Sequence, residues 1–253
     1  MELNINEPGL LYGATIFTTL RVYEKSLNHP LTNWKAHCDR LKFSLQKFGW
    51  SLPDWEVLRQ GAELIIKRDP TLRILRITIF PDGREWITVR LLPTDLSHRQ
   101  HHGVDVYVAS TELSRSLPTH KTGNYLSPWL AKNAAQKFAA QEAILVNTEG
   151  NWLETSTGNL WGWGNNSWWT PPLDAGILPG VMRNQLINWL KQNHYQVYEF
   201  PWTNQLVQDL EAIAYSNSVV EIVPIREVIQ GKQKLQYEPS HPSFSQLRRL
   251  FEI

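Results

Sequence analysis

The residues with clear chemical potential lie in a few short segments, and none of these segments is a standard enzyme signature. The chain lacks the GxSxG, GxGxxG and Walker patterns of hydrolases, dinucleotide enzymes and nucleoside triphosphatases. Its eight histidines form no HExxH pair, so we expect no catalytic metal. The segments are FTTLRV (17–22), HCDRL (37–41), KTGNYL (121–126), LETSTGNL (153–160), TPP (170–172) and GILPGVMR (176–183).

One of these segments predicts an anion-binding turn. Residues 178–182 (LPGVM) read as a loop that turns into the N-terminus of a helix. Backbone N–H groups at a helix start point away from the helix, and the helix dipole favours negative charge there. Gly180 has no side chain, so the backbone can come close to the bound group. A phosphate is the kind of ligand that such a turn holds.

The composition narrows the possible partners. The chain has 25 Lys and Arg against 24 Asp and Glu, a net charge of +1, which argues against nucleic acid or an anionic membrane as partner. Cys38 is the only cysteine, which excludes an internal disulfide and fits a reducing compartment. The sequence begins without the features of a secretory signal, and no stretch approaches the ~18 apolar residues of a membrane span. We therefore expect a cytoplasmic protein whose partner is neither nucleic acid nor a membrane.

The spacing of apolar residues predicts helices and a hairpin in the first part of the chain. Steps of three and four predict a helix over 33–48 and a second helix from Trp55. Alternation over 75–79 and 87–91 predicts two strands. The Pro-Asp-Gly turn at 81–83 joins them in a hairpin, because Pro fixes φ and Gly accepts a positive φ.

The rest of the chain predicts a second, strand-rich domain. A strand over 104–108 precedes a polar, irregular stretch, where we place an interdomain linker at 113–120. A helix is predicted over 127–140, with its inward face formed by Trp129, Leu130, Ala134 and Phe138. Further predicted elements are strands at 143–146, 152–154, 160–163, 168–169, 196–200 and 213–216 and a helix at 180–193. This order is typical of an α+β fold.

Together, these segments resemble the class IV aminotransferase family in their order and separation, from about Gly9 to Pro224. The resemblance implies a two-domain enzyme of pyridoxal-phosphate fold type IV. We expect a small N-terminal α/β domain at 1–112, the linker at 113–120 and a larger, strand-rich cofactor-binding domain at 121–253. The resemblance also implies pyridoxal 5'-phosphate as cofactor, a homodimer as assembly and no metal.

The resemblance gives three residues their expected roles at the cofactor ring. Lys121 holds the position of the lysine that binds the cofactor aldehyde as a Schiff base and then moves protons. Tyr125 is expected to hydrogen-bond the phenolate oxygen. Glu154 begins an E-x-x-x-x-N segment that ends at Asn159, and its carboxylate is expected to keep the pyridine nitrogen protonated.

The same resemblance assigns the phosphate donors. Arg40 resembles the phosphate arginine of the family, and its fork-shaped guanidinium suits this anion. Gly180, Val181 and Met182 are expected to bind through their backbone. Met182 stands where other members have threonine, so a hydroxyl contact is lost while the backbone donors stay. Ser218 is expected to supply a further donor.

Two positions bear on which activity of the family this chain has. Aminotransferase members usually carry glutamate where this chain has Thr18, and Phe-Thr-Thr looks like the lyase version. Arg84 is either a contact for a substrate carboxylate or a charge at the hairpin tip. The resemblance thus implies a lyase that converts 4-amino-4-deoxychorismate to 4-aminobenzoate and pyruvate in folate synthesis. The alternatives are a branched-chain or D-amino-acid aminotransferase and a non-catalytic relative, which is disfavoured because Lys121, Glu154 and Arg40 are all present.

Overall fold

The computed structural model describes residues 5–69 and 71–252. The chain divides into two compact units, here called the first and the second unit. The first unit comprises the chain up to Pro93 together with His120–Tyr125. The second unit comprises Thr94–Thr119 and the chain from Leu126 onward.

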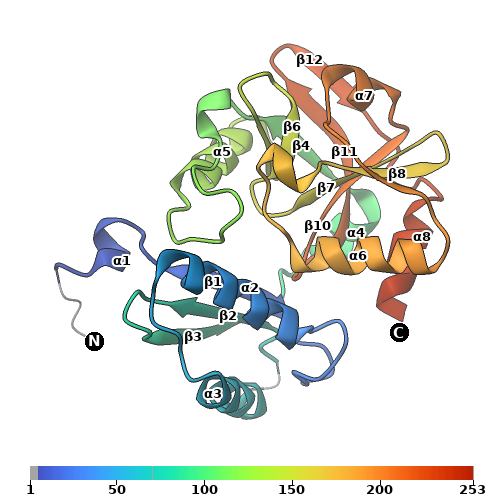
Figure 1. Ribbon diagram of the computed structural model, residues 1–253. Helices are drawn as coiled ribbons and strands as arrows, with labels where there is room; N and C mark the ends of the chain where they lie inside the picture. Colours follow the sequence, from blue (N-terminus) through green and yellow to red (C-terminus); the bar gives the residue numbers. More distant parts are fainter. Residues whose placement is uncertain (1–4, 70, 253) are drawn as a thin grey trace. The chain divides into compact units, whose positions relative to one another are not determined.

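The first unit contains a three-stranded antiparallel sheet in the order β1-β2-β3 and three helices (Figure 1). The strands are β1 (Ile16–Arg21), β2 (Ile74–Ile79) and β3 (Glu85–Arg90). The helices are α1 (Pro8–Leu11), α2 (Trp34–Phe48) and α3 (Trp55–Arg68). The helices predicted over 33–48 and from Trp55, and the hairpin, are confirmed. Gly49 ends α2 at φ 66° and Gly83 closes the hairpin turn at φ 88°, a backbone region that favours glycine.

The sheet of the first unit has one apolar and one polar face. Successive strand residues point to opposite faces, so the apolar alternation predicted for β2 covers one side with core residues. This core comprises Ile16, Leu20, Leu41, Leu45, Leu58, Ala62, Leu75, Ile77 and Ile79, drawn from β1, β2, α2 and α3. The opposite face carries Phe17 and Thr19 of β1, and the register places Thr19 directly opposite Arg76.

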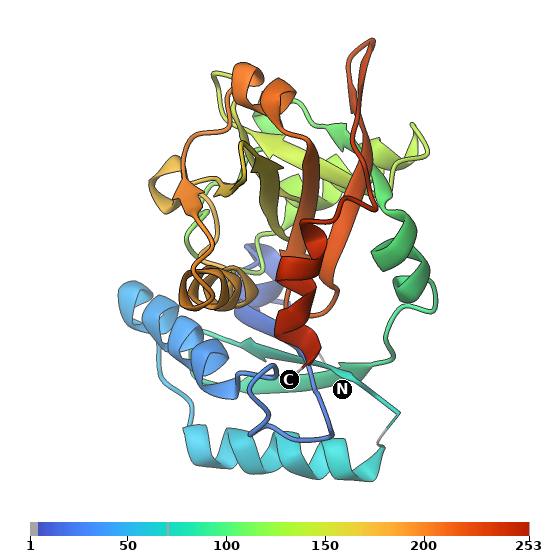
Figure 2. The ribbon, with the colours of Figure 1, turned by 90° about the vertical axis from the view of Figure 1, so that its right-hand side faces the viewer.

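The second unit is built on a nine-stranded sheet that closes on itself. The strands are β4 (Val104–Val108), β5 (Glu142–Val146), β6 (Trp152–Thr155), β7 (Asn159–Gly164), β8 (Ser167–Thr170), β9 (Val197–Glu199), β10 (Ala212–Asn217), β11 (Glu221–Gln230) and β12 (Gln233–Gln236). Because β7 also pairs with β10, the path β10-β11-β4-β5-β6-β7 forms a ring, and such closure leaves fewer open edges. Figure 2 shows the β11–β12 pair as a long hairpin.

Helices and short turns complete the second unit. The helices are α4 (Leu96–His102), α5 (Leu126–Gln136), α6 (Val181–Gln192), α7 (Asn204–Asp209) and α8 (Phe244–Arg248), with 3₁₀ turns at Thr111–Leu113, Leu173–Ala175 and Arg249–Glu252. The predicted strands and the helix near 180–193 are confirmed to within a few residues. Several of the twelve tryptophans fill the interior of this unit, namely Trp152, Trp161, Trp168 and Trp202.

The predicted inward face of α5 is wrong. Ala131 and Ala135 are fully buried and pack against the strands, whereas Trp129 is 57% exposed. The helix also ends at Gln136, before Ala139 takes a positive φ of 58°. Small side chains allow a helix to lie close to a sheet, so alanine rather than the large apolar residues occupies the contact. Periodicity alone favoured the larger residues.

The division into units differs from the predicted linker at 113–120. Strand β4 pairs with β5 and β11 and so belongs to the second unit, ahead of the predicted boundary. The segment 120–125 instead pairs with the first unit. The Phe17 N–H donates to the Lys121 carbonyl at 2.9 Å, and Ile16 forms a bridge with Thr122. Long-range backbone pairing decides the division, and local composition does not reveal it.

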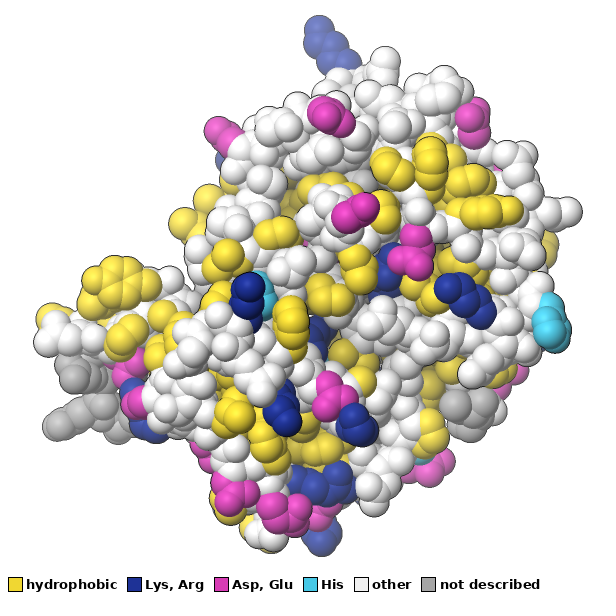
Figure 3. All heavy atoms as spheres, in the orientation of Figure 1, with side chains coloured by type: hydrophobic (Ala, Val, Ile, Leu, Met, Phe, Trp, Pro, Cys, Tyr) yellow, Lys and Arg dark blue, Asp and Glu magenta, His cyan; other side chains and the backbone are white. Residues whose placement is uncertain are grey.

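Two further observations concern membrane-spanning helices and the distribution of charge on the surface. Of the helices within the described residues, none is long and apolar enough to cross a membrane. Acidic and basic side chains are interspersed over the face of the molecule drawn in Figure 3. This mixture agrees with the net charge of +1.

Candidate functional site

Lys121 lies at the polar face of the sheet in the first unit. Its Nζ is 4.9 Å from the ring centroid of Phe17 and 5.2 Å from that of Tyr125. The two rings meet edge to face at 5.7 Å. The structure therefore brings the predicted residues Lys121 and Tyr125 together, and it adds Phe17 between them.

A close backbone approach fixes the segment that carries Lys121. The Gly123 N–H donates to the Thr15 carbonyl at 2.7 Å. A Cβ atom on Gly123 would collide with Thr15 Oγ1 and would come within 2.8 Å of the Gly13 carbonyl oxygen. Only glycine fits here, so the KTGNY spacing sets how closely the lysine segment follows β1.

Arg76 is a second cation on this polar face. Its Cζ lies 3.7 Å from the Phe17 ring centroid, which is cation–π contact distance. Burial lowers the pKa of the guanidinium from its ordinary value, and the charge of Arg90 lowers it further. An arginine held half-buried beside another cation is well placed to take up an anionic group, such as a carboxylate.

The predicted residues Thr18 and Arg40 also meet, but on the other side of β1. Arg40 Nη2 donates to Thr18 Oγ1 at 2.9 Å, and Thr18 Oγ1 lies 2.6 Å from His37 Nδ1. Thr18 is fully buried. The side chain expected at the substrate thus lies on the face opposite Phe17, and Thr19 is the threonine that shares a face with Phe17. Lys121 is nevertheless close enough to this cluster for its charge to lower the pKa of His37.

Arg84 lies at the hairpin tip, as one of its two readings expected. Its guanidinium contacts Asp82 at 2.6 Å and Glu7 at 2.7 Å. These hydrogen bonds raise the pKa of Arg84 above its ordinary value. Within the first unit the structure does not bring Arg84 to Lys121 or Arg40, and its role as a substrate residue stays a prediction.

Glu154 is a buried carboxylate in the second unit. Its side chain is 5% exposed, and it accepts a hydrogen bond from Arg115 Nη1 at 2.9 Å. The other carboxylate oxygen accepts from the Leu178 N–H at 3.2 Å and from Asn159 Nδ2 at 3.5 Å. A carboxylate offers about four lone-pair directions, so it can accept one more donor while these contacts persist.

The expected anion-binding turn lies next to this carboxylate. Asn159 Nδ2 also donates to the Leu178 carbonyl at 2.9 Å, which ties the E-x-x-x-x-N segment to the loop before α6. Gly180 is the N-cap of α6 and provides no side-chain cap, so the first N–H groups of the helix keep their donor capacity. A Cβ atom on Gly180 would collide with Asn159 Oδ1. The structure brings together Glu154, Gly180, Val181 and Met182.

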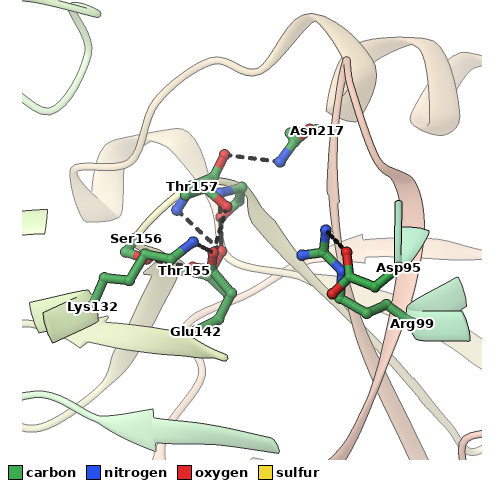
Figure 4. A network of polar contacts seen from close by, with 9 residues as sticks. Asp95, Arg99, Lys132, Glu142, Thr155, Ser156, Thr157 and Asn217 are labelled. Atoms are coloured by element: carbon green, nitrogen blue, oxygen red, sulfur yellow. Dashed lines mark hydrogen bonds and ion pairs between the residues drawn. The ribbon is translucent and has the colours of Figure 1, made fainter. Parts of the chain in front are cut away.

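A polar network supports the turn that joins Glu154 to Asn159 (Figure 4). Glu142 is 2% exposed and accepts from Lys132 at 2.7 Å, from Thr157 Oγ1 at 3.0 Å and, over a short hydrogen bond, from the Ser156 hydroxyl. Asn217 Nδ2 donates to the Thr157 carbonyl at 3.2 Å. Ser218 follows Asn217, so this contact ties its loop to the same turn.

Sequence reasoning missed five of these residues. Phe17, Thr19 and Arg76 become evident only when the segment FTTLRV is read as a strand, because alternation then separates Thr18 from Thr19. His37 and Arg115 are buried partners of predicted residues. His37 lies in the HCDRL segment, but no local pattern shows that its ring contacts Thr18. Arg115 lies in none of the segments named above, and its partner Glu154 is 39 residues away.

Comparison with known proteins identifies the family. The family model for class IV aminotransferases matches residues 15–228. An aminodeoxychorismate lyase from Vibrio harveyi is 24% identical over 241 residues, covering 89% of this chain and 87% of that protein. A branched-chain-amino-acid aminotransferase from Escherichia coli K12 is also 24% identical, covering 90% of this chain and 80% of that protein.

A solved structure shows the same fold. The crystal structure of the Escherichia coli branched-chain amino acid aminotransferase aligns with a TM-score of 0.85 at 22% identity, over 99% of this chain and 88% of that chain. The predicted α+β class is confirmed by this likeness. Members of the matched family depend on pyridoxal phosphate. On the extent of the family match, this chain belongs to the class IV aminotransferases, a family of pyridoxal-phosphate enzymes.

Proposed function

We propose that this chain is the lyase that converts 4-amino-4-deoxychorismate to 4-aminobenzoate and pyruvate. The observation that carries the proposal is the polar face of the first unit, where Phe17, Thr19, Arg76, Lys121 and Tyr125 gather. These side chains bring two positive charges and two hydroxyls and no carboxylate. The substrate carries two carboxylates, so a cationic face without a like charge suits it.

The residues of the second unit fit the ring and phosphate of pyridoxal phosphate. Glu154 is a buried carboxylate with room for one more donor, which suits a protonated pyridine nitrogen. The N-terminus of α6 offers backbone donors, and Gly180 keeps a side chain out of that turn. Val181 and Met182 would then bind the phosphate through their N–H groups, and Ser218 would add a hydroxyl.

The residues of the first unit fit the remaining parts of the cofactor. Lys121 provides the amine for the aldehyde, and Tyr125 provides a hydroxyl for the phenolate oxygen. Arg40, whose guanidinium is already oriented by Thr18, provides a planar donor for the phosphate.

The chemistry divides between the cofactor and the chain. When bound, pyridoxal phosphate supplies an electron-withdrawing ring that takes up charge as a C–H bond breaks. Glu154 keeps the ring nitrogen protonated for this purpose. Once the substrate amine has replaced it on the aldehyde, Lys121 Nζ would remove the proton from the substrate carbon that bears the amino group. The C–O bond to the enolpyruvyl group would break as the substrate ring becomes aromatic, and Lys121 would return the proton to the released enolpyruvate to give pyruvate. Arg76 holds a substrate carboxylate, and Thr19 offers a hydroxyl on the same face.

An aminotransferase acting on branched-chain or D-amino acids is the second candidate. The branched-chain enzyme from Escherichia coli matches this chain as well in identity as the Vibrio harveyi lyase does. Such an enzyme shares the roles of Lys121 and Glu154 but also needs a keto acid as second substrate. The substrate carboxylates and the cationic face favour the lyase.

One experiment separates the two candidates. The purified protein, loaded with pyridoxal phosphate, is incubated with 4-amino-4-deoxychorismate, and 4-aminobenzoate is measured by chromatography. Parallel samples contain branched-chain or D-amino acids with 2-oxoglutarate, and glutamate is measured. We expect 4-aminobenzoate and pyruvate in equal amounts. Amino transfer without any 4-aminobenzoate would overturn the proposal in favour of the aminotransferase.

A further inference from the structure

Three side chains of the first unit form a hydrogen-bonded chain that ends on the candidate phosphate arginine. His37 and Arg40 lie one turn apart on α2, and Thr18 lies on β1. Arg40 Nη2 is 2.9 Å from Thr18 Oγ1, and Thr18 Oγ1 is 2.6 Å from His37 Nδ1. Thr18 and His37 are 0% and 1% exposed, so water does not compete for these contacts.

The two hydrogen bonds, from Arg40 to Thr18 and from Thr18 to His37, donate in the same direction. A guanidinium only donates, so Thr18 Oγ1 accepts from Arg40. A hydroxyl can accept two hydrogen bonds, but among the described residues His37 Nδ1 is the one acceptor within reach of the Thr18 proton, so we assign that proton to it and a lone pair to Nδ1. Burial, followed by the charges of Arg40 and Lys121, holds the pKa of His37 well below its ordinary value, so the ring is neutral. This network assigns the Nε2–H tautomer to His37.

His37 is an unusual choice for this buried position. Among the described residues its Nε2 has no hydrogen-bond partner, so the ring gains only one hydrogen bond. A buried polar group without a partner destabilises a fold, and an apolar side chain would avoid that cost. The one contact that histidine adds is the acceptor for Thr18. That acceptor fixes the hydroxyl rotor, so the lone pairs of Thr18 face Arg40.

We propose that His37, acting through Thr18, positions the Arg40 guanidinium to bind the phosphate of the cofactor. Thr18 is then a positioning residue rather than a substrate contact. The inference rests on the proposed role of Arg40 at the phosphate. It predicts that the hydroxyl at position 18 and the acceptor at position 37 matter for the phosphate and not for the rest of the cofactor.

The test compares two ligands that differ only in the phosphate. The full chain is freed of cofactor, and its Kd is measured for pyridoxal 5'-phosphate and for pyridoxal. We define the phosphate discrimination as the Kd for pyridoxal divided by the Kd for pyridoxal 5'-phosphate. We expect Thr18→Val and His37→Phe each to lower this ratio about tenfold, which corresponds to ~1.4 kcal/mol. The affinity for pyridoxal should stay within about twofold.

Conservative variants and a matched control separate positioning from general destabilisation. Thr18→Ser keeps the hydroxyl and His37→Asn keeps an acceptor near Nδ1, so both should retain most of the discrimination. The double variant Thr18→Val/His37→Phe should lose no more phosphate discrimination than either single variant, because both substitutions interrupt the same series of hydrogen bonds. Thr32→Val is the control, since Thr32 is a fully buried threonine of the same unit whose hydroxyl bonds only backbone groups of residues 23 and 26.

The outcomes distinguish this inference from the proposed function. If the wild-type chain does not bind pyridoxal phosphate, or if Arg40→Ala keeps full discrimination, the phosphate role of Arg40 fails. If Arg40→Ala loses discrimination while Thr18→Val and His37→Phe keep it, only the positioning role is overturned. Equal weakening for both ligands, or the same loss in Thr32→Val, would also overturn it. Should His37→Phe not fold, the Thr18→Val and Thr18→Ser pair decides.

Discussion

The two units of this chain present their candidate cofactor groups in different ways. In the first unit the groups are side chains, Lys121 and Arg40, carried by separate elements and held by other side chains. In the second unit most donors are backbone N–H groups at the start of α6, and Glu154 is the main side chain. One substitution removes a side-chain donor, whereas a backbone donor survives most substitutions. The effects of mutation should therefore differ between the units.

The largest effect is expected from Lys121→Ala. This variant loses both the amine that binds the cofactor and the group that moves the proton, so 4-aminobenzoate formation should fall by at least ~10³-fold. Borohydride reduction of the wild-type protein followed by peptide mapping should place the phosphopyridoxyl group on Lys121. Its attachment to another lysine would show that the first unit does not carry this role.

The next effect, in the second unit, comes from Glu154→Gln. The neutral amide cannot keep the pyridine nitrogen protonated, and loss of one preorganised charge typically costs ~2–4 kcal/mol, or about 10²–10³ in rate. Turnover of the folded variant is the measurement. Glu227→Gln is the control, because that carboxylate pairs with Lys234 at the surface of the same unit. Near wild-type turnover in Glu154→Gln would show that Glu154 does not keep the pyridine nitrogen protonated.

Substitution of Arg40 tests whether the first unit binds the phosphate through a side chain. Arg40→Ala should raise the Kd for pyridoxal phosphate by roughly 10–100-fold, since a charge-assisted contact is lost. Arg40→Lys should recover only part of the affinity, because an ammonium group lacks the planar fork. Arg59→Ala provides a comparison, since Arg59 pairs with Glu63 at the surface of this unit. Unchanged affinity in both Arg40 variants would make it an ordinary helix arginine.

Substitution at position 182 tests whether the second unit binds the phosphate through backbone N–H groups. We expect only a small change in cofactor affinity. Met182→Leu conserves volume at this buried position, so the Kd for pyridoxal phosphate should change by less than about threefold. Gly180→Ala should weaken binding more, because its Cβ collides with Asn159. Titration of both variants with pyridoxal phosphate checks the ranking. A large loss in Met182→Leu alone would show that the side chain, not the backbone, binds the phosphate.

The last prediction concerns pH and affects folding stability rather than activity. The pKa of His37 is held well below its ordinary value of 6.5, mainly by burial. Below pH 6.5 the unfolded chain binds a proton that the folded chain does not, so folding stability falls as pH falls, by up to ~1.4 kcal/mol per pH unit. Urea unfolding at pH 7.5 and pH 5.5 measures this. The loss should be smaller in His37→Asn.

Local patterns predicted most elements of the fold, and long-range pairing explains the misses. The helix α2 and the β2–β3 hairpin follow from periodicity and from a turn with Pro and Gly. The linker was misplaced because the pairing of Phe17 with Lys121 joins distant segments. The inward face of α5 was misjudged because close packing favours Ala131 over Trp129.

The residues of the candidate site also divide into those that local sequence predicts and those that depend on long-range contacts. Lys121 and Glu154 lie in segments with a recognisable spacing, so sequence alone could nominate them. The choice between Thr18 and Thr19 needs the strand direction and the sheet that covers it, and no local pattern supplies either. Arg115 was missed because its partner Glu154 is 39 residues away, beyond α5 and β5.

The return of segment 120–125 to the first unit has a consequence for biogenesis. As the chain leaves the ribosome, the residues up to Pro93 emerge first and contain both β1 and its partner β2, yet the backbone contacts of Ile16 and Phe17 with Lys121 and Thr122 form only later. Strand β4, which emerges between them, waits still longer for its partner β11. Contacts of such high sequence separation slow folding. The first unit is therefore complete only when the segment that carries Lys121 has emerged.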